Sequence, residues 1–183
     1  YPLRRQRQMC IRDRKKDASR RDLTINSIYS DTEGNLFDPF DGKEDLENGL
    51  IKFIGNPEQR IKEDYLRVLR YLRFFLKYSN HKHDPQVLKI IKKNLNGVSN
   101  LSKERLLDEL KKYIKSQILI RLSKDKFSVE LFEIIFPQVK NIKLFSNPNT
   151  FAKKKLEEAN YVFLLSLLII CLLYTSDAAD EED

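Results

Sequence analysis

Charged side chains gather on one face of a predicted helix over residues 56–78. Advancing by about 100° per residue places them within about three turns. They are four arginines and two carboxylates: Arg60, Glu63, Asp64, Arg67, Arg70 and, at the edge of the face, Arg73. The chain elsewhere favours Lys, so the use of Arg here indicates a need for planar, bidentate donors. The alternative is a solvated face whose charges pair with one another.

The same stretch carries the signals of a helix that would hold these charges in place. Asn56 is a favourable N-cap, Pro57 suits the first helical position, and Glu58 places a negative charge in the first turn. The opposite arc is apolar and contains Ile61, Tyr65, Val68, Leu69, Leu72, Phe75 and Leu76. The sequence therefore predicts one continuous helix with a buried face and a charged face.

Strand patterns precede this helix, and helical patterns follow it. The expected strands cover residues 23–30, 36–38 and 50–54. Residues 32–35 form an expected hairpin turn, and Asp41 is expected to cap a short helix that ends at Gly49. Further helices are expected over residues 84–94, 102–116, 123–136 and 149–173. The predicted fold class is mainly α with a small β remnant (α+β).

Composition indicates a globular protein with an anionic partner. The 183 residues are 41% hydrophobic and 33% charged, and the net charge of +7 favours nucleic acid or nucleotide phosphates. The two cysteines, Cys10 and Cys171, give no disulfide framework, which predicts a reducing, cytoplasmic location. The apolar run over 161–173 is too short for a bilayer, so it is expected to be a core helix and no membrane association is predicted.

The two ends differ in character from the rest of the chain. Residues 1–14 are rich in Arg and show neither a helical nor a strand period, and residues 174–183 switch abruptly to small and acidic side chains. Both resemble translated sequencing-adapter read-through, and we expect them to pack against nothing. A genuine basic arm and acidic tail are the alternative.

Four motifs follow one another in a fixed order. They are RRDxTxN over residues 20–26, DPFxG over 38–42, GNP over 55–57, and EDxLRxLR over 63–70. In this order and spacing they resemble the bacterial-type tRNA nucleotidyltransferase and poly(A) polymerase family, and LSKERLLDELKKY over 101–113 resembles the family's next helical motif.

The resemblance implies a division of the chain. Residues 15–55 would be the end of a nucleotidyltransferase head, 56–120 a helical neck that binds nucleotide and RNA, and 121–173 the start of a helical body. In the family, Mg²⁺ is held by carboxylates of a Gly-Gly and Asp-x-Asp segment upstream of RRDxTxN. This chain has no such segment, so we expect an N-terminally truncated fragment that contains no catalytic or metal-binding residue and is inactive alone.

The resemblance also names the nucleotide-binding residues. An acceptor beside a donor matches the pairing edges of adenine and cytosine and clashes with those of uracil and guanine. Asp64 and Arg67, one turn apart on the predicted helix, have this character. The expected nucleotide-binding set is Arg21, Asp22, Asn26, Asp64, Arg67, Arg70 and Arg73, supported by Arg20, Arg60 and Glu63. A purely structural role for Asp22 and Asn26 stays open.

The implied function is addition or repair of the 3′ CCA end of tRNA from CTP and ATP. Poly(A) polymerase is the nearest alternative because it shares these motifs. A non-catalytic, basic helical module that binds RNA is the alternative from a different class. The expected partners are therefore the 3′ end of tRNA or another RNA, together with CTP and ATP.

Overall fold

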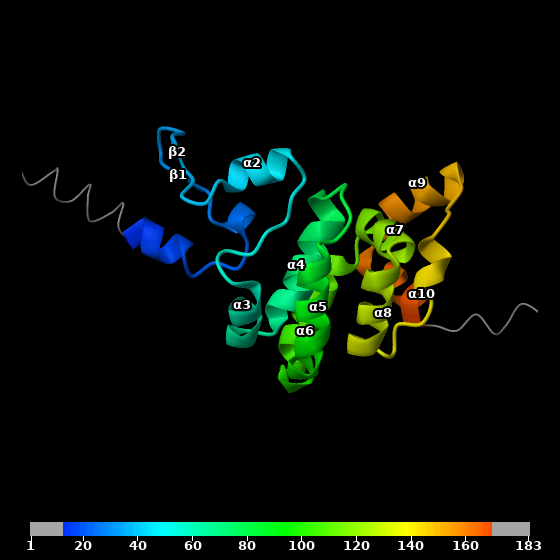
Figure 1. The fold of residues 1–183 in the computed structure, drawn as a ribbon. Helices are drawn as coiled ribbons and strands as arrows, with labels where there is room; N and C mark the ends of the chain where they lie inside the picture. The colour runs from blue at the N-terminus through cyan, green and yellow to red at the C-terminus, as the bar shows by residue number, and fades with distance from the viewer. Residues whose placement is uncertain (1–12, 170–183) are drawn as a thin grey trace, which may run out of the picture. The chain divides into compact units, whose positions relative to one another are not determined.

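The computed structural model describes residues 13–169 and divides the chain into two compact units, Tyr1–Leu106 and Leu107–Asp183. Figure 1 shows the order of the helices along the chain. The boundary between the units lies at a different place from the predicted division at 55/56 and 120/121, which stays a prediction. The two end segments that resemble adapter read-through, residues 1–14 and 174–183, lie outside the described residues, except for residues 13 and 14, which are helical.

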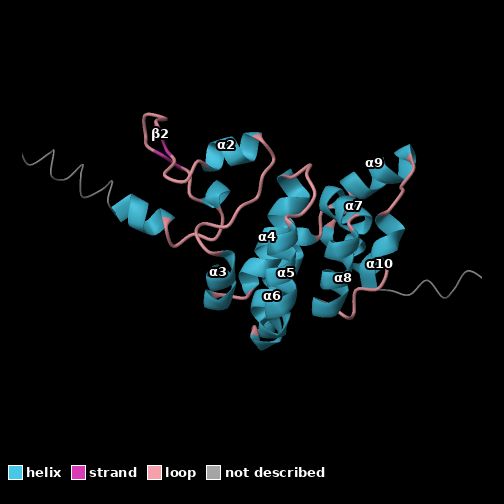
Figure 2. Cartoon of the chain, in the orientation of Figure 1, coloured by secondary structure: helices cyan, strands magenta, loops and turns pink. Residues whose placement is uncertain are grey.

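The β structure of the first unit is small, as the predicted fold class requires. The strands β1 (Tyr29–Ser30) and β2 (Leu36–Phe37) pair antiparallel, with Tyr29 opposite Phe37. They are the only part drawn as strand among the described residues in Figure 2. The mainly α fold with a β remnant is thus confirmed.

Two of the three expected strands are wrong in extent. Residues 24–26 form the short 3-10 helix η1 (Thr24–Asn26), which the Ser27 hydroxyl closes by donating to the Thr24 carbonyl at 2.6 Å. Side chains such as Ser27 compete locally with strand pairing, which explains the turn. The expected strand over 50–54 pairs only through an isolated bridge between Phe53 and Leu23.

The helix α2 (Gly42–Glu47) is capped by Asp38 and not by Asp41, which corrects the sequence prediction. The Asp38 carboxylate accepts from the backbone N–H of Gly42 at 2.9 Å and of Lys43 at 2.7 Å. Asp41 has a φ of 55°, in the left-handed region, and its side chain makes no capping bond. The DPFxG motif is therefore a turn that starts α2.

The predicted helix over 56–78 is two helices, α3 (Pro57–Glu63) and α4 (Leu66–Tyr78). Asp64 has φ −157° and ψ 108°, which is extended backbone, so the prediction of one continuous helix is wrong. The expected start holds, because the Asn56 side chain accepts from the Gln59 N–H at 3.0 Å. The break leaves Tyr65 against Gly97, where an added Cβ would lie 2.1 Å from the Tyr65 ring.

The core of the first unit lies along α4. Val68, Leu69 and Leu72 are fully buried on its inner face. The helix α3 packs against α5 (Pro85–Asn94), which leads into the 3-10 helix η2 (Leu95–Asn100). The predicted start of α5 is confirmed, because Asp84 accepts from the Gln86 N–H at 2.8 Å.

All of the regular secondary structure in the described part of the second unit is helical. The helix α6 (Lys103–Tyr113) leads into it and is followed by α7 (Ser116–Lys124), α8 (Lys126–Ile135), η3 (Ile142–Phe145), α9 (Thr150–Glu158) and α10 (Tyr161–Ile169). Its core includes the fully buried side chains of Leu119, Leu122, Phe132 and Ile142.

Three expected helices of this region have different limits. The helix expected over 102–116 ends at Tyr113, and the one expected over 123–136 begins at Lys126 after a separate α7. The expected long helix over 149–173 is interrupted at 159–160, where Asn160 accepts from the Phe163 N–H at 2.9 Å and starts α10. Residues 170–173 of that expectation lie outside the described residues. No helix within residues 13–169 is both long enough and apolar enough to cross a membrane.

Candidate functional site

Asp22 is held in place by two short backbone pairings. Its carbonyl accepts from the Ile54 N–H at 3.0 Å, and the Thr24 N–H donates to the Lys52 carbonyl at 3.0 Å. These bonds tie the RRDxTxN segment to the residues just before α3. The Asp22 side chain is only 4% exposed and points at α4, where the Arg70 guanidinium pairs with its carboxylate.

The ionised form of Asp22 is favoured in spite of its burial. Burial alone raises the pKa of the carboxyl, but hydrogen bonds from Arg70 and from the Asn26 amide, at 2.9 Å, outweigh it and the pKa is lowered. Asp22, Asn26 and Arg70 are thus brought together as one charged, hydrogen-bonded group. Three of the predicted site residues share this group.

Arg21 belongs to a separate, more exposed cluster. Its guanidinium pairs with Asp17 at 3.1 Å and lies 6.0 Å from the centre of the Tyr29 ring. The Tyr29 hydroxyl donates to the same Asp17 carboxylate at 2.7 Å. These bonds from Tyr29 and Arg21 lower the pKa of Asp17, so the cluster keeps an ionised carboxylate beside a guanidinium.

Arg60, Glu63 and Arg67 form a third group at the end of α3. Glu63 accepts from Arg67 at 2.6 Å and from Arg60 at 3.0 Å, and these bonds lower its pKa. Arg67 also donates to the Arg60 carbonyl at 3.0 Å and to the Arg20 carbonyl at 3.3 Å. Arg60 bonds the carbonyls of Ile54, at 2.9 Å, and Ser19. The two arginines therefore clamp the backbone before Arg21 and Asp22.

Asp64 lies in the break between α3 and α4. One carboxylate oxygen accepts from the Leu66 N–H at 3.1 Å, and the other pairs with Arg105 of α6 at 2.7 Å. Asp64 and Arg67 therefore have different partners and do not stand one turn apart on a rigid helix, which corrects that part of the prediction. The Asp64 side chain stays 31% exposed and the Arg67 side chain 15%.

Arg73 lies further along α4. Its guanidinium stands 4.4 Å from the centre of the Phe74 ring. Arg20, predicted to support the site, contributes its backbone carbonyl to Arg67, and its side chain is exposed.

Sequence reasoning missed Arg105 as a partner of the site. Ser102 accepts from the Arg105 N–H at 3.4 Å at the start of α6, as a capping residue does. A capping box would place Glu or Gln at position 105, and the Arg found there was the signal of another role.

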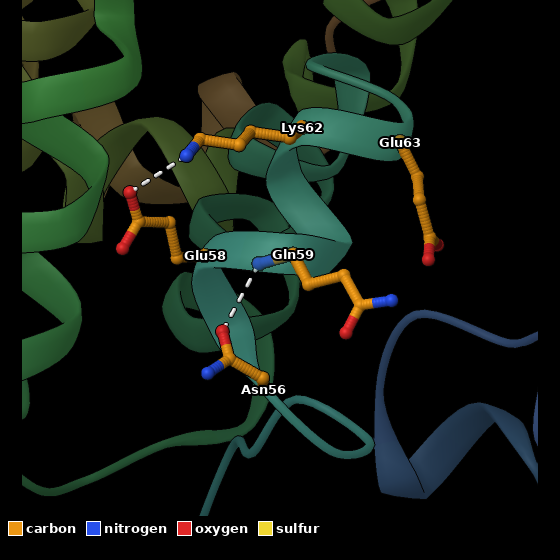
Figure 3. A pocket seen from close by; sticks show the side chains of 5 residues that line it. All are labelled: Asn56, Glu58, Gln59, Lys62 and Glu63. Atoms are coloured by element: carbon orange, nitrogen blue, oxygen red, sulfur yellow. Dashed lines mark hydrogen bonds and ion pairs between the residues drawn. The ribbon is translucent and has the colours of Figure 1, made fainter.

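A shallow hollow on the outer face of α3 does not add to the site. Asn56, Glu58, Gln59, Lys62 and Glu63 line it. Figure 3 shows that Glu63 points away from the ion pair of Lys62 and Glu58. The Asn56 side chain accepts from the Gln59 N–H at the start of α3. Glu58 also pairs with Lys93 at 2.9 Å. Glu58 and Glu63, the two acidic residues that line the hollow, both already pair with cations, so the hollow is part of a surface ion-pair network.

The residues that the structure describes do not fit a bound divalent metal ion. Within the part of the chain that the structure describes, no three Asp, Glu, His or Cys side chains gather in a way that could hold one. His81 and His83 have other partners, since His81 bonds the Asn48 carbonyl at 2.8 Å and His83 stacks on Phe75.

Comparison with known proteins shows which family the chain resembles. The protein-family model described as "Poly A polymerase head domain" matches residues 2–52. A second family model, described as "Probable RNA and SrmB- binding site of polymerase A", matches residues 82–143. Human mitochondrial CCA tRNA nucleotidyltransferase 1 is 49% identical over 104 residues, which are 56% of this chain and 24% of that protein. The chain belongs to the poly(A) polymerase and CCA-adding nucleotidyltransferase family.

Other relatives of this enzyme family agree. The CCA-adding enzyme of Staphylococcus haemolyticus is 42% identical over 107 residues, covering 58% of this chain and 26% of that protein. The crystal structure of the Bacillus stearothermophilus CCA-adding enzyme in complex with CTP matches with a TM-score of 0.58 at 27% identity, covering 74% of this chain and 35% of that one. The chain spans about a quarter of the length of the curated relatives that it matches.

The two family matches frame the candidate site. Arg21, Asp22 and Asn26 lie in the head-domain match, and Arg105 lies in the RNA-binding match. The helices α3 and α4 lie between them. The ion pairs of Asp22 with Arg70 and of Asp64 with Arg105 therefore each join a residue inside a family match to a helix junction or helix between the matches.

Proposed function

We propose that this chain supplies the nucleotide-reading part of a template-independent RNA nucleotidyltransferase that adds or repairs the CCA end of tRNA from CTP and ATP. The observation that carries the proposal is the junction of α3 and α4, where Asp64 offers an acceptor and Arg67, in the first turn of α4, offers donors. Asp64 and Arg67 lie shortly before Arg70 in the sequence, and the ion pair of Arg70 with Asp22 connects this part of the chain to the RRDxTxN segment.

Reading a base at this junction follows from its hydrogen-bonding character. Adenine and cytosine each present an amino donor beside a ring-nitrogen acceptor. Asp64 retains acceptor capacity beyond its bonds to Leu66 and Arg105, because a carboxylate has about four lone-pair sites. Arg67 would donate to the ring nitrogen. Uracil and guanine present the reverse pattern, which sets an acceptor against an acceptor and a donor against a donor.

The clamp of Arg60 and Arg67 on the backbone supports this role. It fixes the segment before Asp22 against the end of α3, so the charged groups of the head segment and the helix junction are positioned together. A site held by several bonds binds its ligand with less loss of conformational freedom. Arg21, Asn26, Arg70 and Arg73 stay proposed nucleotide contacts on the same basis.

Mg²⁺ is implied by the family and is part of the proposal only for the whole enzyme. It would neutralise the phosphates of the incoming nucleotide and activate the RNA 3′-hydroxyl. The residues described here do not supply its ligands. The cytoplasmic location and the division into head, neck and body are also proposals.

Poly(A) polymerase is the second candidate, since the matching head-domain model carries that description. Use of CTP separates the two. A chimera in which this chain replaces the matching segment of human CCA tRNA nucleotidyltransferase 1 would be assayed with tRNA that ends before the CCA. We expect addition of C, C and A. A folded chimera that adds only runs of A would favour poly(A) polymerase, and one that adds nothing would contradict the proposal.

A further inference from the structure

One face of α4 combines aromatic rings with cations. Arg70, Arg73, Phe74, Lys77 and Tyr78 recur at helical spacing along it, and we call this set the α4 stripe. The opposite face of α4 is the buried one. The stripe remains partly exposed, and no Asp or Glu occurs between residues 65 and 80. Arg70, at one end of the stripe, pairs with Asp22, and Lys77, toward the other end, is exposed, so the stripe offers a cation to solvent on a rigid support.

The rings and cations of the α4 stripe are arranged face to face. The Phe74 and Tyr78 rings stack with centres 6.0 Å apart and an interplanar angle of 15°. The Arg73 guanidinium lies 4.4 Å from the Phe74 centre, and the Lys77 ammonium lies 4.7 Å from the Tyr78 centre. Each aromatic ring thus has a cation held beside it.

We propose that the α4 stripe is a stacking platform for the single-stranded 3′ end of an RNA. Aromatic faces that accept bases, together with cations that neutralise phosphates, are the combination by which proteins bind single strands without reading sequence. This inference rests on the proposed function and adds Phe74, Lys77 and Tyr78 to the RNA-contacting residues. A pair of cation–aromatic contacts that only steadies the helix is the alternative.

The position and length of the stripe suit this role. Arg70, at one end, is the residue that pairs with Asp22 in the candidate nucleotide site. From Arg70 to Tyr78 the helix rises about 12 Å, the length of roughly three stacked nucleotides at about 3.4 Å each. The terminal nucleotides of an RNA could therefore lie along α4 with the growing end toward Asp22.

The test measures RNA affinity of the full chain with a fluorescein-labelled oligoribonucleotide of about eight residues that ends in CC. Binding is followed by fluorescence anisotropy at fixed salt, and folding by thermal unfolding. Replacing both rings (Phe74→Leu with Tyr78→Leu) is expected to weaken binding about 10- to 100-fold, because stacking contributes to affinity base by base. Lys77→Gln is expected to lower the salt dependence of binding by about one phosphate contact.

Phe151→Leu is the matched control. Phe151 is 71% exposed on α9 and has Lys155 at 6.0 Å from its ring, so it is a cation–aromatic pair outside the stripe. Its loss should leave RNA affinity unchanged. An oligonucleotide with abasic sugars at its last three positions should bind the wild-type chain and the double variant equally.

Three results would overturn the platform. They are a wild-type chain that does not bind the oligonucleotide, a folded double variant with wild-type affinity, and a double variant that loses as much affinity for the abasic strand. If the double variant does not fold, Lys77→Gln decides: an unchanged salt slope contradicts the proposal. None of these measurements depends on nucleotide selectivity, so failure of the proposed function would be seen separately.

Discussion

Asp22 and Arg70, which lie 48 positions apart in the sequence, form an ion pair, with the Asp22 side chain 4% exposed and the Arg70 side chain 32% exposed. The pair joins the segment that precedes the small sheet to the middle of α4. It also places an ionised carboxylate beside the guanidinium face that the sequence predicts to bind nucleotide. Its two partners are unequally buried, so they should respond unequally to removal.

Arg70→Ala should destabilise the chain more than Asp22→Ala does. Removing Arg70 leaves a buried carboxylate whose remaining donors, the Asn26 amide and the Leu23 N–H, are uncharged, and we expect this to cost about 3 kcal/mol. Removing Asp22 leaves a guanidinium that water can reach, at a cost of about 1–2 kcal/mol. Chemical unfolding of each variant measures the difference. Lys43→Ala, which breaks an exposed pair with Glu47, should stay below about 0.5 kcal/mol, and an equal cost for Arg70→Ala and Asp22→Ala would contradict the account.

The stability that Asp22 contributes should disappear in acid. Its pKa is lower in the folded chain than the value of about 3.9 for an unfolded Asp, so the contribution is complete above about pH 4 and is lost as the pH falls through the lowered folded value. Other carboxylates titrate in the same range, and the comparison with Asp22→Asn isolates this one. The difference in free energy of unfolding between wild type and Asp22→Asn should shrink below pH 4. A difference that stays constant down to about pH 3 would show that the pair does not depend on the charge of Asp22.

Helix starts were predictable where they depend on neighbouring residues. Asn56 with Pro57, and Asp84 with Pro85, start α3 and α5 as expected, because the capping side chain bonds an N–H two or three residues away. The break at Asp64 was not predictable from local pattern. At the break, the Tyr65 ring lies against Gly97, and Arg105, 41 positions further along the chain, donates to the Asp64 carboxylate.

The candidate site shows the same limit. The residue types and their motif positions indicated which charged groups matter, but not which of them would pair. Glu63 takes both Arg60 and Arg67, so Arg67 is not the partner of Asp64. A helical projection assumes unbroken geometry, and the two sides of the break turn these side chains to different partners.

Gly42→Ala should destabilise the first unit by about 2–3 kcal/mol. A Cβ at this position would lie 2.2 Å from the Thr24 carbonyl oxygen, and backbone cannot move aside as the end of a side chain can. Gly34→Ala is the comparison, because it meets no atom within 4 Å and has only the strain of a φ of 86°. We expect it to cost about 1 kcal/mol. Thermal unfolding measures both, and a Gly42→Ala chain as stable as wild type would refute the close contact of α2 with η1.

Arg105→Ala should reduce the preference for CTP and ATP while leaving stability almost unchanged. The pair with Asp64 is partly exposed on both sides, so its loss should cost less than about 1 kcal/mol. Asp64 would keep its bond to Leu66 but lose the group that fixes its other oxygen. Isothermal titration with the four nucleoside triphosphates measures the effect. An unchanged preference would mean that Arg105 only holds α6, and tighter binding of CTP would mean that it competes with the base.

Titration of the chain with CTP, ATP, UTP and GTP tests most directly whether Asp64 and Arg67 read the pairing edge of the nucleotide. Wild type should bind CTP and ATP more tightly. Asp64→Ala should lose about 1.5–3 kcal/mol for these two, roughly 10- to 100-fold, with unfolding free energy within about 1 kcal/mol of wild type. Arg67→Lys keeps the charge but loses the planar fork, so it should also lose preference. Wild-type discrimination against UTP and GTP in both folded variants would contradict the account.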